Sequence, residues 1–144
     1  MNAFVCAGAG FLLAVLWFDL MFDVQALRPR HGELPEQTLA SIAGYYRRVT
    51  TAARPMNRLV AAAMLATLGA LVVEIAKGVY AAWVGWASLA LALTAARTVP
   101  SAVRLGGRTD TAEVQSGLAR AICRDHLICI LAIAAVLVVQ LAAT

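Results

Sequence analysis

Charged residues are scarce in this sequence. Twelve lysine and arginine residues and eight aspartate and glutamate residues make up only 14% of its 144 positions, whereas a soluble globular domain carries about 25%. Apolar residues account for 62% of the chain. One water-soluble core of this size cannot bury so large an apolar excess. The composition therefore excludes an ordinary soluble domain and predicts an integral membrane protein in contact with the lipid bilayer.

The chain also lacks the motifs that define common nucleotide and hydrolase sites. It has no GxGxxG sequence, phosphate-binding loop, GxSxG or HExxH. Its basic residues are not interleaved with aromatic side chains on which bases stack, so the net charge of +4 does not predict a nucleic-acid partner. Its three cysteines, an odd number without repeated spacing, do not form a disulfide framework.

Four apolar segments are each long enough to cross a bilayer as a helix, for which about 20 residues suffice. We predict spans at residues 3–27, 56–75, 79–98 and 124–143. The connections at residues 28–55 and 99–123 are polar, and Pro100 is expected to end the third span. The sequence thus predicts an all-α integral membrane four-helix bundle that forms a single domain over residues 1–144.

The first connection contains an additional helical pattern. Pro35 suits the first turn of a helix, and the apolar residues that follow it recur at helical spacing: Leu39, Ile42, Ala43, Tyr46 and Val49. This spacing predicts a short amphipathic helix that lies in the membrane interface between the first and second spans.

The basic residues are distributed asymmetrically. Eleven arginines lie in the two long connections and the adjoining helix ends, whereas Lys77 alone lies in the connection between the second and third spans. Because cytoplasmic connections are enriched in lysine and arginine, we expect both long connections in the cytoplasm and both termini outside. The bacterial inner membrane is the expected location.

Two aspartates occur at the end of the first apolar segment. Asp19 and Asp23 lie four residues apart, so a helix places them on one face. An acid costs about 2.5–3.5 kcal/mol at the bilayer centre and less near the edge, and it usually has a partner. We expect that partner to be Arg58 or Arg97, which lie at the same level on neighbouring helices.

His126 lies at the same depth, at the start of the fourth span. Two interpretations of this polar layer remain open. In the first, charge pairs only join the helices. In the second, the layer is a cavity open to the cytoplasm, in which His126 is a catalytic acid or base and Asp19 and Asp23 orient it. The candidate ligand-binding residues of such a site are Trp17, Tyr46, Asn57, Arg58 and Arg97.

A metal site is the least favoured interpretation of the layer. The chain has no Glu-x-x-His pair of the di-iron type. Cys123, His126 and Cys129 follow one another at intervals of three, so their directions spread over about 120° and do not converge on one ion. We predict no metal site, and the sequence indicates no particular cofactor.

Several short motifs resemble a known family. They are the Leu34-Pro35 dipeptide before the amphipathic segment, Pro55 before the second span, Val99-Pro100 after the third, and Arg124-Asp125-His126 at the start of the fourth. In this layout the chain resembles the DUF1772 family of small membrane proteins, which includes the fungal anthrone oxygenases and many bacterial proteins. The resemblance implies a four-helix membrane bundle.

Two departures separate the chain from that family pattern. Ser101 and Ala102 follow the proline where the family tends to show Asn, and Cys129 stands where it tends to show Arg. The resemblance therefore implies an architecture rather than a reaction. Three functions remain open: binding or conversion of a hydrophobic, phenol-like small molecule, a non-enzymatic subunit of a larger membrane complex or homo-oligomer, and, least favoured, a small transporter.

Overall fold

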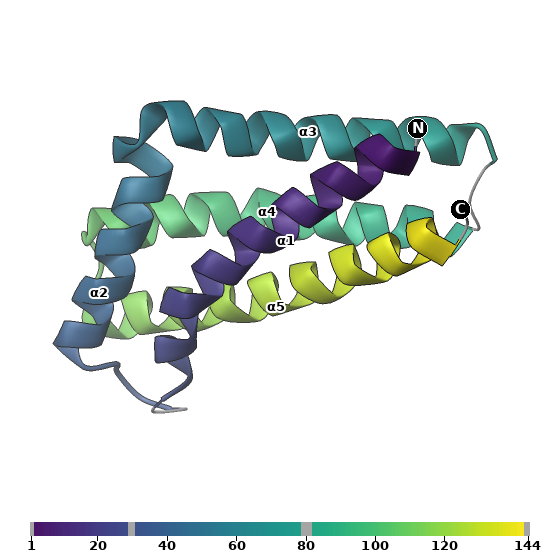
Figure 1. Ribbon diagram of the computed structural model, residues 1–144. Helices are drawn as coiled ribbons and strands as arrows, with labels where there is room; N and C mark the ends of the chain where they lie inside the picture. Colours follow the sequence, from purple (N-terminus) through teal and green to yellow (C-terminus); the bar gives the residue numbers. More distant parts are fainter. Residues whose placement is uncertain (1, 29–30, 79–81, 143–144) are drawn as a thin grey trace.

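The computed structural model describes residues 2–28, 31–78 and 82–142, which contain helices and no strand. Four long helices run lengthwise, α1, α3, α4 and α5, and the shorter α2 lies across one end of them (Figure 1). The bounds are Asn2–Asp23 for α1, Glu36–Arg47 for α2, Arg54–Ala76 for α3, Ala82–Gly107 for α4 and Ala112–Ala142 for α5. A 3₁₀ turn at Val24–Leu27 extends α1, and a π-helical turn at Arg48–Ala52 follows α2.

Among the described residues, three segments are long and apolar enough to cross a membrane: Ala3–Leu27, Asn57–Ala76 and Ala112–Val139. Residues 79–81, where the third expected span begins, lie outside the described residues. The prediction of an all-helical membrane protein is therefore confirmed, and three of the described helices are candidates to cross the membrane.

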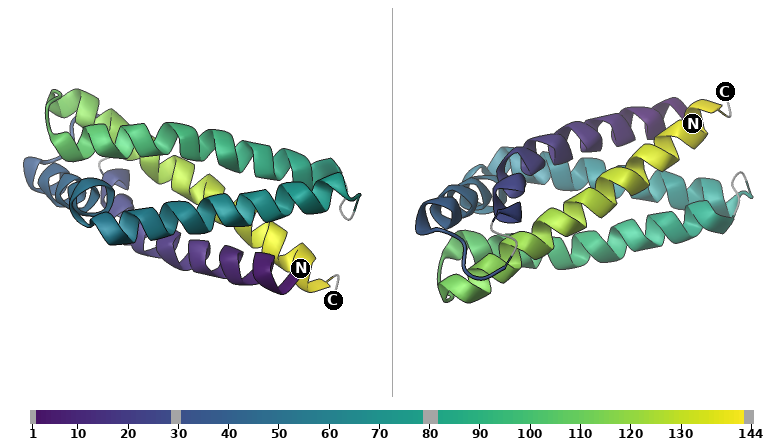
Figure 2. Two further views of the ribbon diagram at one scale, coloured as in Figure 1. Left: turned by 90° about the horizontal axis from the view of Figure 1, so that it is seen from above. Right: turned by 90° about the horizontal axis from the view of Figure 1, so that it is seen from below.

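The long helices pack in a closed arrangement. Helix α1 contacts α3 and α5, and α4 contacts the same two helices from the other side. The start of α1, the end of α3, the start of α4 and the end of α5 lie opposite the end that α2 covers (Figures 1 and 2). The end covered by α2 therefore gathers the end of α1, the start of α3, the end of α4 and the start of α5 at one level.

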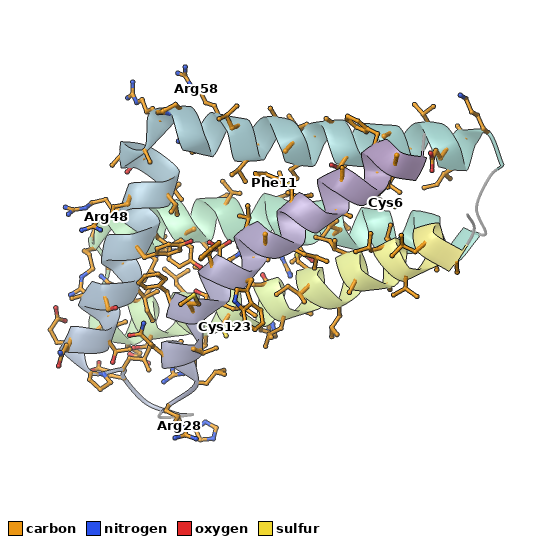
Figure 3. All side chains as sticks on the ribbon, viewed as in Figure 1. Cys6, Phe11, Arg28, Arg48, Arg58 and Cys123 are labelled. Carbon is orange, nitrogen blue, oxygen red and sulfur yellow. The ribbon has the colours of Figure 1, made fainter. Side chains whose placement is uncertain are left out.

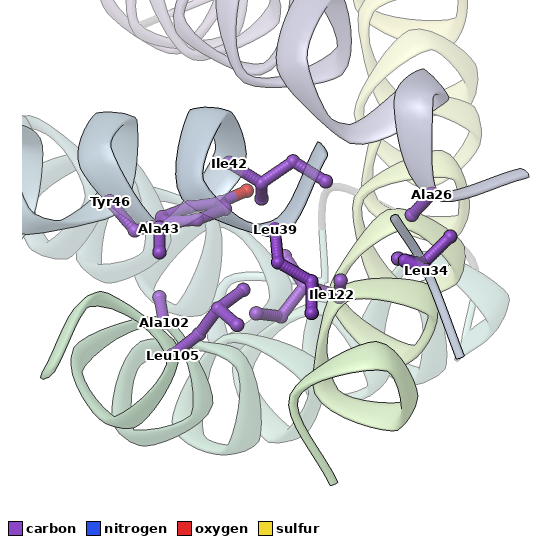
Figure 4. Packing of buried hydrophobic residues seen from close by; sticks show 10 residues of the cluster. Ala26, Leu34, Leu39, Ile42, Ala43, Tyr46, Ala102, Leu105 and Ile122 are labelled. Carbon is purple, nitrogen blue, oxygen red and sulfur yellow. The ribbon is translucent and has the colours of Figure 1, made fainter. Parts of the chain in front are cut away.

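Helix α2 buries its apolar stripe in the protein. Leu39, Ile42, Ala43 and Tyr46 are buried, and they form one cluster with residues of α4 and α5 (Figure 4). Their partners there are Ala102, Leu105, Ala119 and Ile122. Full burial of a leucine or isoleucine side chain contributes about 1.5–3 kcal/mol relative to exposure. Protein contacts thus explain the amphipathic pattern of α2 without any contact with lipid.

Pro100 does not interrupt helix α4, although proline is a strong local signal for the end of a helix. Helix α4 continues through Pro100 to Gly107. Proline removes one backbone hydrogen bond and strains the preceding turn. The turns beyond it are nevertheless held, because Ala102 and Leu105 are buried against α2. Tertiary packing therefore outweighs the local preference of proline.

Gly106 marks the closest approach of α4 to α2. A Cβ atom at this position would lie 2.8 Å from the Arg47 backbone nitrogen and 3.1 Å from its Cα. Because these are backbone atoms, they cannot rotate away. At Gly107, by contrast, a Cβ atom would meet nothing within 4 Å. The neighbouring glycines therefore form a matched pair for an experiment.

We expect Gly106→Ala to lower the free energy of unfolding by about 1–3 kcal/mol, as overpacking of a tight contact does. Gly107→Ala should leave stability unchanged or raise it by up to about 1 kcal/mol, because alanine is the better helix former. Thermal unfolding in detergent, followed by circular dichroism, measures both. Equal melting temperatures for the two variants would contradict the close approach of α2 and α4.

Candidate acid-base site

Five polar side chains from three elements meet beneath α2, and we call them the acid-base centre: Asp19, Asp23, Tyr45, Tyr46 and His126. The Tyr45 hydroxyl donates a hydrogen bond to Asp19 Oδ1 at 2.5 Å, and the Tyr46 hydroxyl donates one to Asp23 Oδ1 at 2.6 Å. The spacing of four residues between the aspartates on α1 matches the adjacent tyrosines on α2. Each carboxylate therefore has its own phenol.

The imidazole of His126 lies between the two carboxylates. Its Nδ1 is 2.7 Å from Asp23 Oδ2, and since an ionised carboxylate only accepts, Nδ1 carries the hydrogen and donates it. Nε2 lies 4.0 Å from Asp19 Oδ2, which is beyond hydrogen-bond length. Asp23 thus fixes the tautomer of the ring and leaves Nε2 as the nitrogen that can accept a proton.

The centre is largely withdrawn from solvent. The side chains of Asp23, His126 and Asp19 are 0%, 9% and 14% exposed. Phe22 stacks on the Tyr45 ring at a centroid distance of 4.1 Å, which shields the outer phenol. Burial of charged groups is expensive and is repaid only with good partners. Such groups cluster at functional sites more often than at purely structural ones.

Tyr45 and Tyr46 remain neutral donors over a wide range of pH. Burial first, and then the neighbouring carboxylates and their hydrogen bonds, raise the pKa of both phenols well above the ordinary value of about 10. In the unfolded chain the phenols ionise near pH 10, whereas in the folded protein they keep their protons. The folded state therefore binds more protons above that pH, so stability must fall as the pH rises further.

We expect the free energy of unfolding of the wild-type protein to fall steeply above about pH 10. The Tyr45→Phe, Tyr46→Phe double variant should be less stable at neutral pH, because two hydrogen bonds are lost, and should show a shallower decline in alkali. Chemical unfolding between neutral pH and strong alkali, followed by circular dichroism, measures both slopes. Parallel slopes for the two proteins would contradict the raised pKa values.

The prediction that Asp19 or Asp23 pairs with Arg58 or Arg97 was wrong. Arg97 Nη2 lies 3.6 Å from Asp125 Oδ1 instead, and Arg124 Nη2 lies 3.4 Å from the same oxygen. Arg58 is exposed and projects from α3 away from α1 (Figure 3). Asp125 and His126 are neighbours on α5, so they point in directions about 100° apart. Asp125 therefore pairs with the two arginines, whereas His126 faces the two aspartates of α1.

The structure divides the remaining ligand-binding candidates. Tyr46 belongs to the acid-base centre. Trp17 is 66% exposed, so it does not cover the centre as expected. Asn57 donates from Nδ2 to the Thr50 carbonyl, 2.7 Å away, which stabilises the turn after α2. Sequence reasoning did not select Tyr45, although its place beside Tyr46 in a helix that follows two acids was an available signal.

Two cavities lie outside the acid-base centre and are not lined by its residues. One is apolar, has a volume of about 20 Å³ and lies between the long helices; it is lined by Ala9, Leu12, Thr67, Leu68, Leu71, Leu91, Ala132, Ile133 and Val136. The other is a groove between α2 and the end of α4. The side chains of the centre contact one another directly through their hydrogen bonds.

The described part of the chain contains no group of three or more His, Cys, Asp or Glu side chains arranged to hold a metal ion. Cys6, Cys123 and Cys129 are free thiols, and the latter two are buried. No protein-family model, curated protein or solved structure matches the chain. The fold and the apolar helices define the class of protein, an all-helical membrane protein.

Proposed function

We propose that the chain is an integral membrane enzyme in which His126 takes a proton from, or gives one to, a hydrophobic small molecule. One observation carries this proposal. His126 Nδ1 lies 2.7 Å from a carboxylate oxygen of the fully buried Asp23. Its Nε2 makes no hydrogen bond within the described part of the chain, and Asp19 Oδ2 lies 4.0 Å from it. A carboxylate that orients an imidazole in this way is the usual arrangement of a histidine general base.

In the proposed step, the Nε2 lone pair accepts a proton from a weakly acidic group of the substrate. The resulting imidazolium is stabilised by Asp23 through Nδ1 and by Asp19 on its other side. Tyr45 and Tyr46 hold the two carboxylates in place through the hydrogen bonds that they donate. Nε2 then returns a proton to the product, and the proton on Nε2 exchanges with water while the helices are parted. The step changes no oxidation state and needs no further reactant.

The apolar surroundings support a hydrophobic substrate. The small cavity is lined by Leu12 on α1 and Ile133 on α5, which lie seven residues, or about 10 Å along the helix, from Asp19 and His126 on the same faces. The seam between α1 and α5 therefore leads from apolar side chains to the centre. A volume of about 20 Å³ holds little more than one water molecule, so binding requires these helices to part. The resemblance to anthrone oxygenases also favours a phenol-like or anthrone-like molecule.

The proposed membrane placement follows the charges. Helix α4 is the third of four spans, both termini are outside the cytoplasm, and α2 lies at the cytoplasmic interface of a bacterial inner membrane. The eleven-to-one distribution of arginine and lysine supports this orientation. The acid-base centre then lies at the cytoplasmic ends of α1 and α5, where a proton can exchange with water when the helices part.

Proton abstraction can be tested without knowledge of the natural reaction. Anthrone is a hydrophobic carbon acid, and a general base exchanges its methylene protons for deuterium in deuterium oxide. We expect the protein in nanodiscs to accelerate this exchange under anaerobic conditions, and His126→Gln to lower the rate by about 10²–10⁴-fold. Mass spectrometry of the anthrone measures the exchange. Arg54→Gln, an exposed change outside the centre, serves as the control and should exchange at the wild-type rate.

A second candidate function is favoured by the close packing of the centre. If the hydrogen bonds serve only to join α1, α2 and α5, the chain is a non-enzymatic subunit of a membrane complex. In that case His126→Gln lowers stability but the wild-type protein gives no exchange above that of empty nanodiscs. The same experiment therefore separates the two functions.

A further inference from the structure

A groove of about 520 Å³ lies between α2 and the end of α4, outside the acid-base centre. It is lined by Glu36, Ala40, Ala43, Gly44, Arg47, Thr51, Val103, Gly106, Gly107 and Arg108. Its volume is in the range of small-molecule sites. Half of its lining residues are alanine or glycine, so the helix backbones are accessible between the polar side chains. No residue of the acid-base centre lines this groove.

Two arginines with different environments face the groove. Arg108 directly follows the last residue of α4 and has a left-handed backbone conformation, with a φ of 55°. It lines the groove together with Gly106 and Gly107. Its Nη2 donates a hydrogen bond to Glu36 Oε1. Its Nη1 is buried and has no hydrogen-bond partner among the described residues. Arg47 is exposed and has no carboxylate partner in the described part of the chain.

We propose that this groove binds a phosphate group between Arg47 and Arg108. A guanidinium matches phosphate oxygens with two parallel hydrogen bonds. Arg108 Nη1 is buried in this conformation, so it reaches a bound phosphate when the guanidinium turns as Glu36 releases it, and the phosphate then supplies the acceptor that Nη1 lacks. Buried donors are rarely left without an acceptor in native proteins. The groove contains two positive groups and only one negative group, Glu36, so its net charge also favours an anion.

The position of the groove indicates the source of the phosphate. It lies at the end of the molecule where α2 crosses the long helices (Figure 1), which is also the end that carries the arginine-rich connections. Basic pockets at the cytoplasmic ends of membrane helices are typical binding sites for lipid headgroups. A phospholipid headgroup and a soluble phosphate share the chemistry recognised here, and an experiment can distinguish them.

Glu36 acts as a competing anion in this arrangement. Its side chain is 72% exposed, so it can swing away from Arg108 when a phosphate arrives. Removal of its charge should therefore strengthen phosphate binding, even though the variant loses an ion pair. This opposite direction separates a binding effect from a general loss of stability.

The full-length protein is reconstituted in phosphatidylcholine nanodiscs that contain a minor fraction of phosphatidylglycerol, and native mass spectrometry counts the phosphatidylglycerol it retains. We expect Arg47→Gln and Arg108→Gln each to lower retention about tenfold and Glu36→Gln to raise it. Arg54→Gln, which removes an exposed arginine outside the groove, should retain as much lipid as the wild type. A parallel arm measures the melting temperature of lipid-free protein in inorganic phosphate against chloride of equal ionic strength.

Retention that depends on Arg47 and Arg108 supports the proposal with a lipid as the source. A phosphate-specific rise in melting temperature that both variants abolish supports it with a soluble phosphate as the source. If the two variants match Arg54→Gln in both measurements, or if Glu36→Gln lowers retention, the proposal is overturned.

Discussion

Replacement of Asp23 by alanine is expected to lower the free energy of unfolding by about 3–5 kcal/mol, as the loss of one partner from a buried charged pair does. Asp23 is completely buried and accepts hydrogen bonds from both Tyr46 and His126. Its removal leaves two buried donors without an acceptor and opens a space beneath α2. Thermal or chemical unfolding in detergent measures the loss. The parallel variant Asp19→Ala should lower the free energy of unfolding by less. Asp19 is partly exposed, and it accepts a hydrogen bond from Tyr45 but none from His126.

A double variant separates hydrogen bonding from simple packing. In Asp23→Leu, His126→Leu both members of the pair are replaced by apolar side chains of similar size. Such replacements of a whole buried pair are often neutral or stabilising, so the double variant should be more stable than Asp23→Ala, by less than a full replacement would give because the Tyr46 hydroxyl still lacks its acceptor. It should also give no anthrone exchange. If Asp23→Ala unfolds at the wild-type temperature, the buried network has no role in stability.

Several parts of this structure follow from local sequence patterns. The stripe of α2 is buried at the residues that its helical spacing indicates, because Leu39, Ile42 and Tyr46 can reach a core only on one side of a helix. Asp19 and Asp23 face the same way, as a spacing of four requires. The prediction that a polar layer forms at the ends of α1 and α5 needed only the order of the helices and their antiparallel packing.

The partners within that layer did not follow from the sequence. Depth along a helix can be counted from residue numbers, but rotation about its axis depends on packing with every neighbour. Asp125 and His126 lie at nearly the same depth, yet His126 faces Asp23 while Asp125 faces Arg97. Choice among partners at one depth therefore requires the three-dimensional structure.

The same limit explains why two other local signals were misleading. Pro100 is a strong local signal for the end of a helix, and it was outweighed by contacts between α4 and α2 that lie far apart in the sequence. Trp17 was expected over the polar layer, but its position on α1 points it outward. In both cases long-range packing decided what local chemistry left open.

The membrane orientation has an all-or-none test. In a variant in which Cys6, Cys123 and Cys129 are replaced by alanine, a single cysteine is introduced at Arg28 or at Lys77, both of which are exposed. We expect Arg28→Cys to react with a membrane-impermeant maleimide only after the cells are permeabilised, and Lys77→Cys to react in intact cells. The physical reason is the positive-inside rule applied to eleven arginines on one side against one lysine on the other.

The two positions control for each other, because they lie at opposite ends of the long helices. Reaction of Arg28→Cys in intact cells, with protection of Lys77→Cys, would reverse the orientation and place the acid-base centre on the outer side. Reaction of both positions from the same side would mean that the segment between them does not cross the membrane an odd number of times. With the expected pattern, the arginine-rich end, the groove between α2 and α4, and His126 all lie on the cytoplasmic side, so His126 exchanges its proton with cytoplasmic water when the helices part.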